Sequence, residues 1–488
     1  MYSKVNYEYY NSPTIFIQES EPFYSLEWTR TWGGSQADEG GDIIIDESNN
    51  AYIIGITSSF GAGILDVVLI KYDSWGNQIW NQTWGESGYD YGLSGEVDGN
   101  DIYLVGNTDF SGSAHGLLVK FNSSGSQIWN RTWSNPGTSE FRGIAKDSDH
   151  NLYLIGSILN NETIYGALLL VKINSSSGTE VWHQIWDSSN NEFSGNIAVD
   201  SNNNIYLVGY TKIVGEFDFE TLLIKYDSAG TQEWNRTWGG DRHHFGESVV
   251  VDDYNNVYIA GTQGFGGDFI DAFMVKYDSM GNCLWNQTWG VLADSETCSD
   301  ILVDSENNSY LTGYFTESGF GTFKFLVKFD SSGNQLWNKT WDIQFQEYCL
   351  GIAADRNANL YLVGSTIYPY DIVLFKYGID SDQDYLTDNL ELNVYQTRVN
   401  DSDTDDDGIL DGIEIYSYGT NPTNWDTDGD GYSDGWEVHN GYDPLNSFSS
   451  PTINILLGVL IAVIIIGITL LIYLKKFRVR KLTRYETH

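Results

Sequence analysis

The chain has 488 residues, with 41% hydrophobic and 15% aromatic residues, which is enough apolar surface for a packed core and excludes a disordered polymer. Its formal net charge is −42, which excludes nucleic acid as a partner, because phosphate binding needs clustered lysine and arginine, and favours cations. Three cysteines are too few for a disulfide scaffold. Cys298 and Cys349 hold equivalent places in neighbouring repeats, where either a disulfide or two buried thiols would fit.

After an N-terminal extension (1–25), residues 26–377 carry three markers that recur in phase roughly every 50 residues. The first marker is a Trp-x-x-x-Trp pair, at Trp28/Trp32, Trp80/Trp84, Trp129/Trp133, Trp182/Trp186, Trp234/Trp238, Trp285/Trp289 and Trp337/Trp341. The second is Tyr-x-x-Gly, starting at Tyr52, Tyr103, Tyr153, Tyr206, Tyr258, Tyr310 and Tyr361. The third is a lysine, at Lys71, Lys120, Lys172, Lys225, Lys276, Lys328 and Lys376.

Each repeat contains four short runs rich in β-branched and aromatic residues, such as GDIIID, AYIIGIT, DVVLIKYD and NQIWNQTW in the first repeat. Four antiparallel strands per repeat predict an all-β, seven-bladed β-propeller. The first Trp pair precedes any complete repeat, and no Trp strand follows Lys376. Residues 26–32 are therefore predicted to form the fourth strand of the last blade and to close the ring.

The segments WGGSQADEGGDIIID, NNAYIIGITSS and LDVVLIKYDSWGNQIW, with their counterparts in the other repeats, resemble the SBBP β-propeller repeat of surface proteins. The resemblance covers roughly residues 26–377. It implies the fold and carries little about function, because such domains mostly lack an assigned activity. KYDSAGTQEW is also similar to quinoprotein repeats, which usually have eight blades and a different tryptophan docking pattern.

An acidic segment, residues 378–446, follows the repeats and contains three twelve-residue loops offset by 23 residues. Oxygen ligands at alternate positions of a tight loop are what Ca²⁺ requires, with a backbone carbonyl at position 7 and a glutamate at position 12. The predicted ligands are Asp380, Asp382, Asp384, Leu386, Asp388 and Glu391 in loop 1 (380–391); Asp403, Asp405, Asp407, Ile409, Asp411 and Glu414 in loop 2 (403–414); and Asp426, Asp428, Asp430, Tyr432, Asp434 and Glu437 in loop 3 (426–437). Position 6 is Gly408 in loop 2 and Gly431 in loop 3. In loop 1 it is Tyr385, so we expect a weaker or distorted site there. A disordered charged spacer is the alternative.

These loops resemble thrombospondin type 3 repeats more than paired EF-hands, because about a dozen residues separate one loop from the next. The resemblance implies an extended stalk that calcium stiffens.

Residues 447–454 form a linker, and residues 455–474 are an apolar run of transmembrane length. A basic tail, residues 475–488, follows. The positive-inside rule places this tail in the cytoplasm and the propeller outside a single-pass cell membrane protein. Sequons in the Trp strands, at Asn81, Asn130, Asn235, Asn286 and Asn338, suit a glycoprotein, although Asn- and Thr-rich strands also create sequons by chance.

No GxSxG, HExxH or Walker A motif occurs in usable context, which predicts a protein that is not an enzyme. The position eight residues before the end of each repeat's first strand is mostly acidic: Asp38, Asp90, Glu192, Glu296 and Glu347. These acids either bind backbone amides of their own loops or form a ligand site at a mouth of the propeller channel.

The chain as a whole predicts a membrane-anchored recognition or adhesion protein at the cell surface, with a protein or glycan ligand outside the cell. The alternatives are an extracellular carbohydrate-active or quinone-dependent enzyme with a site in the channel, and a protein of a structural lattice.

Overall fold

The computed structural model describes residues 23–483 except 111–112, 134–137, 160–165, 189, 213–217, 241, 265–269, 291–294, 318–320, 342–346, 367–369 and 450. The chain divides into two compact units. One contains Trp28–Tyr377, and the other contains Pro22–Glu27 with Gly378–His488. The first unit holds the repeats and the second holds the acidic loops.

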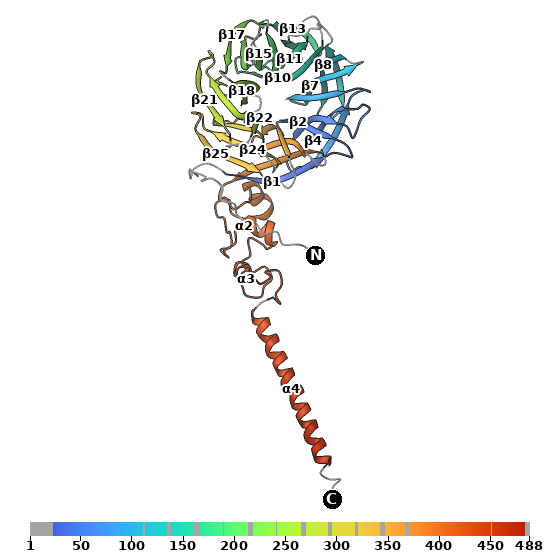
Figure 1. Cartoon of the computed structure of the whole chain (residues 1–488), viewed down its shortest axis with the longest axis vertical. Helices are drawn as coiled ribbons and strands as arrows, with labels where there is room; N and C mark the ends of the chain where they lie inside the picture. The colour runs from blue at the N-terminus through green and yellow to red at the C-terminus, as the bar shows by residue number, and fades with distance from the viewer. Residues whose placement is uncertain are drawn as a thin grey trace. The chain divides into compact units, whose positions relative to one another are not determined.

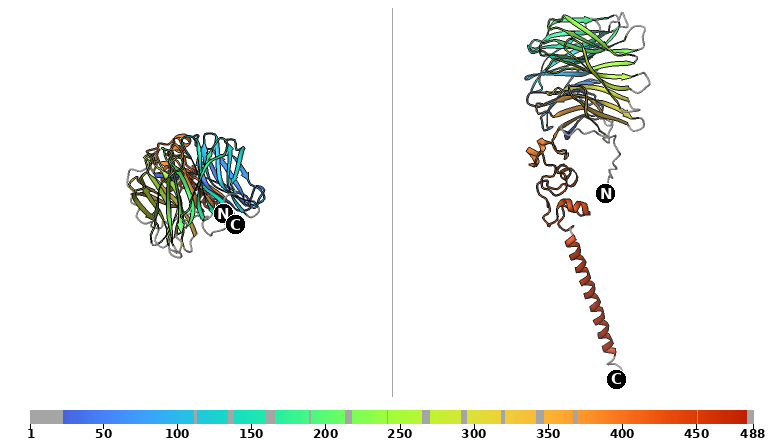
Figure 2. Two further views of the ribbon diagram at one scale, coloured as in Figure 1. Left: turned by 90° about the horizontal axis from the view of Figure 1, so that it is seen from above. Right: turned by 90° about the vertical axis from the view of Figure 1, so that its left-hand side faces the viewer.

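The repeats form seven four-stranded sheets arranged in a ring, which confirms the predicted propeller (Figures 1 and 2). Blade 1 is β2–β5, blade 2 is β6–β9, and this order continues to blade 6, β22–β25. Blade 7 has the order β1-β28-β27-β26, so the N-terminal strand closes the ring as predicted.

The strands occupy four layers from the channel outwards. The innermost strands are β2 (Asp38–Ile45), β6 (Asp90–Asp98), β10 (Thr138–Lys146), β14 (Asn191–Val199), β18 (His243–Val251), β22 (Ser295–Val303) and β26 (Glu347–Ala354). The second strands are β3 (Ala51–Thr57), β7 (Asp101–Phe110), β11 (Asn151–Leu159), β15 (Ile205–Lys212), β19 (Val257–Gly264), β23 (Ser309–Glu317) and β27 (Leu360–Thr366). The third strands are β4 (Asp66–Tyr72), β8 (Ser113–Asn122), β12 (Gly166–Asn174), β16 (Phe219–Tyr226), β20 (Ile270–Tyr277), β24 (Gly321–Phe329) and β28 (Ile372–Asp380). The outermost strands are β5 (Gln78–Trp84), β9 (Gln127–Trp133), β13 (Thr179–Trp186), β17 (Gln232–Trp238), β21 (Cys283–Trp289), β25 (Gln335–Trp341) and β1 (Phe23–Trp32).

Burial follows this layering. Every residue of β4 is buried, because a third strand is covered by the neighbouring blades on both faces, and its sequence is accordingly a continuous apolar run. The outermost strand β5 is mostly exposed. The five sequon asparagines of these outer strands are all exposed. All three cysteines are free thiols, and Cys298 and Cys349 are buried, which is the second of the two arrangements considered for them.

The repeated tyrosine and lysine pack on each other, and together they fix the first hairpin of a blade and its contact with the next blade. In blade 4, Asp200 accepts hydrogen bonds from the Asn204 side chain (2.8 Å) and the Tyr206 hydroxyl (3.0 Å), which fixes the first hairpin. Lys225 lies over the Tyr206 ring, 5.5 Å from its centroid, and donates to the Ser279 carbonyl of blade 5 (3.1 Å). The same contact to a serine carbonyl of the next blade is made by Lys120, Lys172, Lys276 and Lys376.

The second unit contains short helical turns at the ends of the acidic loops. These are α1 (Asp388–Leu390), η1 (Glu391–Tyr395), α2 (Asp411–Ile413), η2 (Glu414–Tyr418) and α3 (Asp434–Asn440), and α4 (Pro451–Thr483) follows.

The prediction of a membrane span at 455–474 needs correction. Among the residues that the structure describes, no helix is both long enough and apolar enough to cross a membrane. This finding contradicts the predicted localisation, a single-pass cell membrane protein with the propeller outside and residues 475–488 in the cytoplasm.

Candidate metal centre

The backbone of the three loops has the tight turn that the spacing predicts. Gly408 and Gly431, at position 6, have φ values of 97° and 96°, in the left-handed region that favours glycine. Tyr385 holds the same position in loop 1 with a φ of 77°. Loop 1 therefore reaches the same turn with a residue that rarely adopts it, at a cost in strain.

Hydrogen bonds inside each loop orient the carboxylates. In loop 2, Asp403 accepts from the backbone amides of Asp407 (3.1 Å) and Gly408 (2.9 Å). Asp411 accepts from the Thr404 amide (2.7 Å), and Glu414 accepts from the Thr420 hydroxyl (3.0 Å). These contacts use both oxygens of Asp403 and one oxygen each of Asp411 and Glu414, whose second oxygens are buried without a hydrogen-bond partner among the described residues.

Carboxylate oxygens gather within 4.8 Å of one another in every loop, from the residues at positions 1, 3 and 5. The groups are Asp380, Asp382 and Asp384; Asp403, Asp405 and Asp407; and Asp426, Asp428 and Asp430. The glutamates at position 12, Glu391, Glu414 and Glu437, are fully buried.

Several of these oxygens are buried and have no hydrogen-bond partner among the described residues. They include both oxygens of Asp382, Asp405 and Glu437 and one oxygen each of Glu391 and Glu414. Burial, and then the charges of neighbouring carboxylates, raises the pKa of Glu391 and of Glu414 to about 8, and that of Glu437 to about 7. Clustered carboxylates with raised pKa values show that the loops concentrate negative charge that a cation would neutralise.

One ligand group crosses between loops. Asp411 of loop 2 lies with Asp384 and Glu391 of loop 1, all three are buried, and their oxygens are within 4.8 Å. Loop 3 approaches loop 2 in the same way, since the Gly435 amide donates to Asp407 (2.7 Å). The sequence placed Asp411 in loop 2 alone. Its contact with loop 1 depends on how the loops stack, which spacing within one loop does not reveal.

The residues fit a calcium ion. The donor set is made only of oxygens, the buried unpartnered oxygens converge, and position 6 makes the turn that a Ca²⁺ loop requires.

The acids predicted for the channel mouth lie between blades. Asp38, Asp90, Glu192 and Glu296 are at most 1% exposed. Asp38 accepts from the Gly34 amide (2.8 Å), Asp90 from the Glu86 amide (2.9 Å) and Glu192 from the Ser188 hydroxyl (2.5 Å). Asp38 and Asp90 thus bind backbone amides of the loop before their own blade, and Glu192 binds a hydroxyl of that loop. The Glu347 side chain lies outside the described residues.

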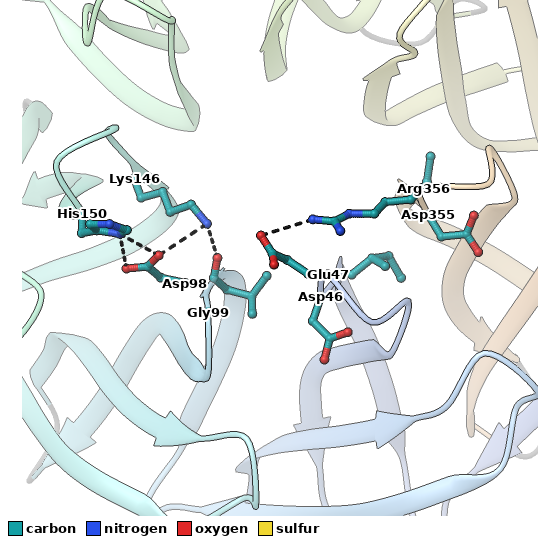
Figure 3. A pocket seen from close by; sticks show the side chains of 11 residues that line it. Asp46, Glu47, Asp98, Gly99, Lys146, His150, Asp355 and Arg356 are labelled. Carbon is teal, nitrogen blue, oxygen red and sulfur yellow. Dashed lines mark hydrogen bonds and ion pairs between the residues drawn. The ribbon is translucent and has the colours of Figure 1, made fainter.

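The channel is lined instead by Asp42, Ser94, Asn196, Ser248 and Asp300, and encloses about 490 Å³. A second cavity of about 350 Å³ lies at the ends of β2, β6, β10 and β26 (Figure 3). Two ion pairs lie in it, Arg356 with Glu47 (3.2 Å) and Lys146 with Asp98 (4.0 Å), and the His150 ring also contacts Asp98 (2.9 Å).

Three segments of the chain match family models. Residues 183–216 match the SBBP beta-propeller repeat, and residues 403–424 and 426–447 match the bacterial TSP3 repeat. The propeller and acidic-loop resemblances are therefore confirmed at the level of these repeats.

Whole-chain likenesses are distant. Over 128 residues the chain is 29% identical to the uncharacterized WD repeat-containing protein L264 of Acanthamoeba polyphaga mimivirus, covering 22% of this chain and 9% of that protein. Among solved structures, an ulvan lyase of polysaccharide lyase family PL25 matches with 11% identity and a TM-score of 0.49, over 71% of this chain and 95% of the lyase. The extracellular domain of a putative hybrid two-component system from B. thetaiotaomicron matches with 16% identity and a TM-score of 0.45, over 72% of this chain and 40% of that one.

Proposed function

We propose that the second unit is a calcium-binding repeat array and that the propeller is a non-enzymatic recognition module for a protein or glycan. The observation that supports the first half is the recurrence, in three loops, of converging buried carboxylate oxygens without hydrogen-bond partners. In each loop the acids, beginning with Asp380, Asp403 or Asp426, would hold one ion. The backbone carbonyl of Leu386, Ile409 or Tyr432 would add a further oxygen ligand. Bound calcium supplies the positive charge that offsets carboxylate repulsion, so the array stiffens when it binds.

Neighbouring aspartates of loop 2 allow a matched test. Asp405 is a predicted ligand whose two oxygens lack hydrogen-bond partners among the described residues, whereas Asp406 is exposed at position 4 and belongs to none of the described carboxylate groups. We expect Asp405→Asn to lower calcium affinity of the full chain by about tenfold or more in calorimetry, because it removes one charged ligand, equivalent to about 1.4 kcal/mol. Asp406→Asn makes the same charge change and should bind like the wild type.

Limited proteolysis gives a second readout. Calcium should protect residues 378–446 from cleavage in the wild type and in Asp406→Asn, and EDTA should remove that protection. Equal cleavage with calcium and with EDTA would contradict the calcium array.

The recognition half of the proposal is supported by the lack of any catalytic motif in the sequence and by the charge-paired cavity at one end of the inner strands. The full chain should be screened against neutral and anionic oligosaccharides and surface proteins, with Arg356→Met as a reporting variant. Retention of an unchanged ligand supports a recognition module. Cleavage of an oligosaccharide during the assay would support the enzyme alternative, with Glu47 and Asp98 as the carboxylates of the cavity.

A further inference from the structure

Two buried carboxylates face each other where blade 1 meets blade 2. Asp66 begins β4 and Asp90 begins β6, and each is 1% exposed. Both lie against the backbone of Gly85: a Cβ atom added there would be 2.1 Å from Asp66 Oδ1 and 2.6 Å from Asp90 Oδ2. The two carboxylates therefore share one small space that a side chain at residue 85 would fill.

Within the described ranges, no positive side chain is paired with these two acids. Asp66 Oδ2 accepts from the Gly63 amide (2.8 Å), and Asp66 Oδ1 has no hydrogen-bond partner among the described residues. In the part of the chain that the structure describes, no lysine, arginine or histidine forms an ion pair with Asp66 or Asp90. Burial, reinforced by the charge of Asp66, raises the pKa of Asp90. Two uncompensated buried charges cost several kcal/mol by general estimates, so a counter-charge is expected.

A related pair of acids lies at other junctions, over a glycine that follows a Trp strand, with one half-buried acid, Asp371 or Asp271, in each pair. At Gly33, the added Cβ would be 2.0 Å from Asp371 Oδ1 and 3.0 Å from Asp38 Oδ2. At Gly290, it would be 2.3 Å from Asp271 Oδ1 and 3.1 Å from Glu296 Oε2. At Gly239 the neighbours are Glu220 and His244, so this junction provides its own basic group.

Two further junctions gain the second acid from a different position. Ala167 and Phe323 stand where Asp66 stands in blade 1, and there the residue after the Trp strand is Asp187 or Asp342 instead of glycine. The charge of Asp187, after burial, raises the pKa of Glu192. Asp342 lies outside the described residues and enters only by its place in the sequence. A second acid thus returns by another route where the first is missing, although like charges repel.

We propose that the Asp66–Asp90 junction binds a hard metal cation of the calcium class, and that the Asp38–Asp371 and Asp271–Glu296 junctions are sites of the same kind. The donors at the first junction are carboxylate oxygens, one of each residue being buried without a hydrogen-bond partner among the described residues, and hard cations prefer oxygen ligands. Each ion would join two blades, and at the first junction it would offset the repulsion of the buried Asp66–Asp90 pair. These sites are separate from the acidic loops and do not depend on calcium binding there.

The test uses the full chain at pH 7, with bound calcium counted by equilibrium dialysis and metal analysis. Asp66→Asn and Asp90→Asn should each bind one ion fewer than the wild type, and Asp253→Asn, at an exposed turn of blade 5, should bind the wild-type number. Calcium should raise the melting temperature of the propeller, followed by tryptophan fluorescence, less in the junction variants than in Asp253→Asn. Equal ion counts in Asp66→Asn, Asp90→Asn and wild type would overturn the proposal.

A shared proton is the competing explanation and gives a different result. In that case, lowering the pH from 7 to 5 would stabilise the wild type and calcium at pH 7 would add nothing that depends on Asp66. That outcome overturns the cation site. Failure of the loops to bind calcium would appear as equal affinities of Asp405→Asn and Asp406→Asn, and would leave the difference between Asp66→Asn and Asp253→Asn intact.

Discussion

At the scale of single residues, the channel wall carries an acid that joins three blades. Asp300 of blade 6 accepts from the Ser248 hydroxyl of blade 5 (2.7 Å) and from the Ile352 amide of blade 7 (3.0 Å). Asp42 has the same role between blades 1 and 2, through the Gly95 amide (2.9 Å). These acids link neighbouring blades through their innermost strands at the channel, whereas the lysines link blades from the third strands.

Burial, and then the nearby charge of Asp42, raises the pKa of Asp300 to about 7. Between about pH 4 and pH 7, Asp300 is therefore protonated in the folded state and ionised in the unfolded state, where its pKa is near 4. The stabilisation that this proton gives is complete below about pH 4 and is lost as the pH rises towards 7. Asp300 lines the channel and is half-buried, so solvent screens part of this effect. We expect the free energy of unfolding to fall by about 1 kcal/mol, which is less than the whole pKa shift would give.

Denaturant unfolding of the wild type and of Asp300→Asn between pH 5 and pH 8 measures this effect. The asparagine side chain of this variant cannot ionise, so the slope of the free energy of unfolding with pH should be smaller in the variant than in the wild type. Asp253→Asn serves as the exposed control and should keep the wild-type slope. A slope that is the same in all three proteins would show that Asp300 does not titrate in this range.

At the scale of elements, the recurring markers could be predicted as one sheet per repeat because each marker has a local cause. The tyrosine hydroxyl binds the hairpin aspartate in every blade except blade 2. The lysine reaches the next blade from blades 2, 3, 4, 5 and 7. The direction of the acidic side chains on the inner strands could not be predicted. A β-bulge interrupts the pairing of each inner strand, as between Gly40 and Asp42, and reverses the alternation of faces. Asp42 therefore lines the channel, while Asp38 faces the neighbouring blade.

Strand β1 closes the ring and is the element whose loss should destabilise the propeller most. Removing it exposes the edge of β28 and the buried Tyr361, whose ring packs 5.9 Å from that of Trp28 in β1. We expect deletion of residues 1–33 to abolish cooperative thermal unfolding, measured by calorimetry. A chain that lacks only residues 1–22 keeps β1 and is the matched control. A sharp, unchanged transition after the longer deletion would contradict closure.

At the scale of the whole molecule, the excess of acids over bases should oppose folding. The chain has 67 acidic and 25 basic residues. The excess negative charges repel one another more strongly in the compact state than in the unfolded chain. Salt screens such repulsion, since the Debye length falls from about 10 Å at 0.1 M to about 3 Å at 1 M. The melting temperature without calcium should therefore rise by several degrees between 0.02 M and 1 M KCl.

Calcium separates this general effect from specific binding. Ions held in the loops and at the blade junctions would neutralise part of the charge, so the rise with KCl should be smaller when calcium is present. Sucrose of matched osmolarity is the control, because it stabilises proteins by being excluded from their surface and carries no charge. It should raise the melting temperature of the calcium-loaded and calcium-free proteins equally. If KCl stabilised the calcium-loaded and calcium-free proteins to the same degree, the bound ions would not be relieving the acid excess. The carboxylate clusters would then be stable through hydrogen bonds and protonation alone.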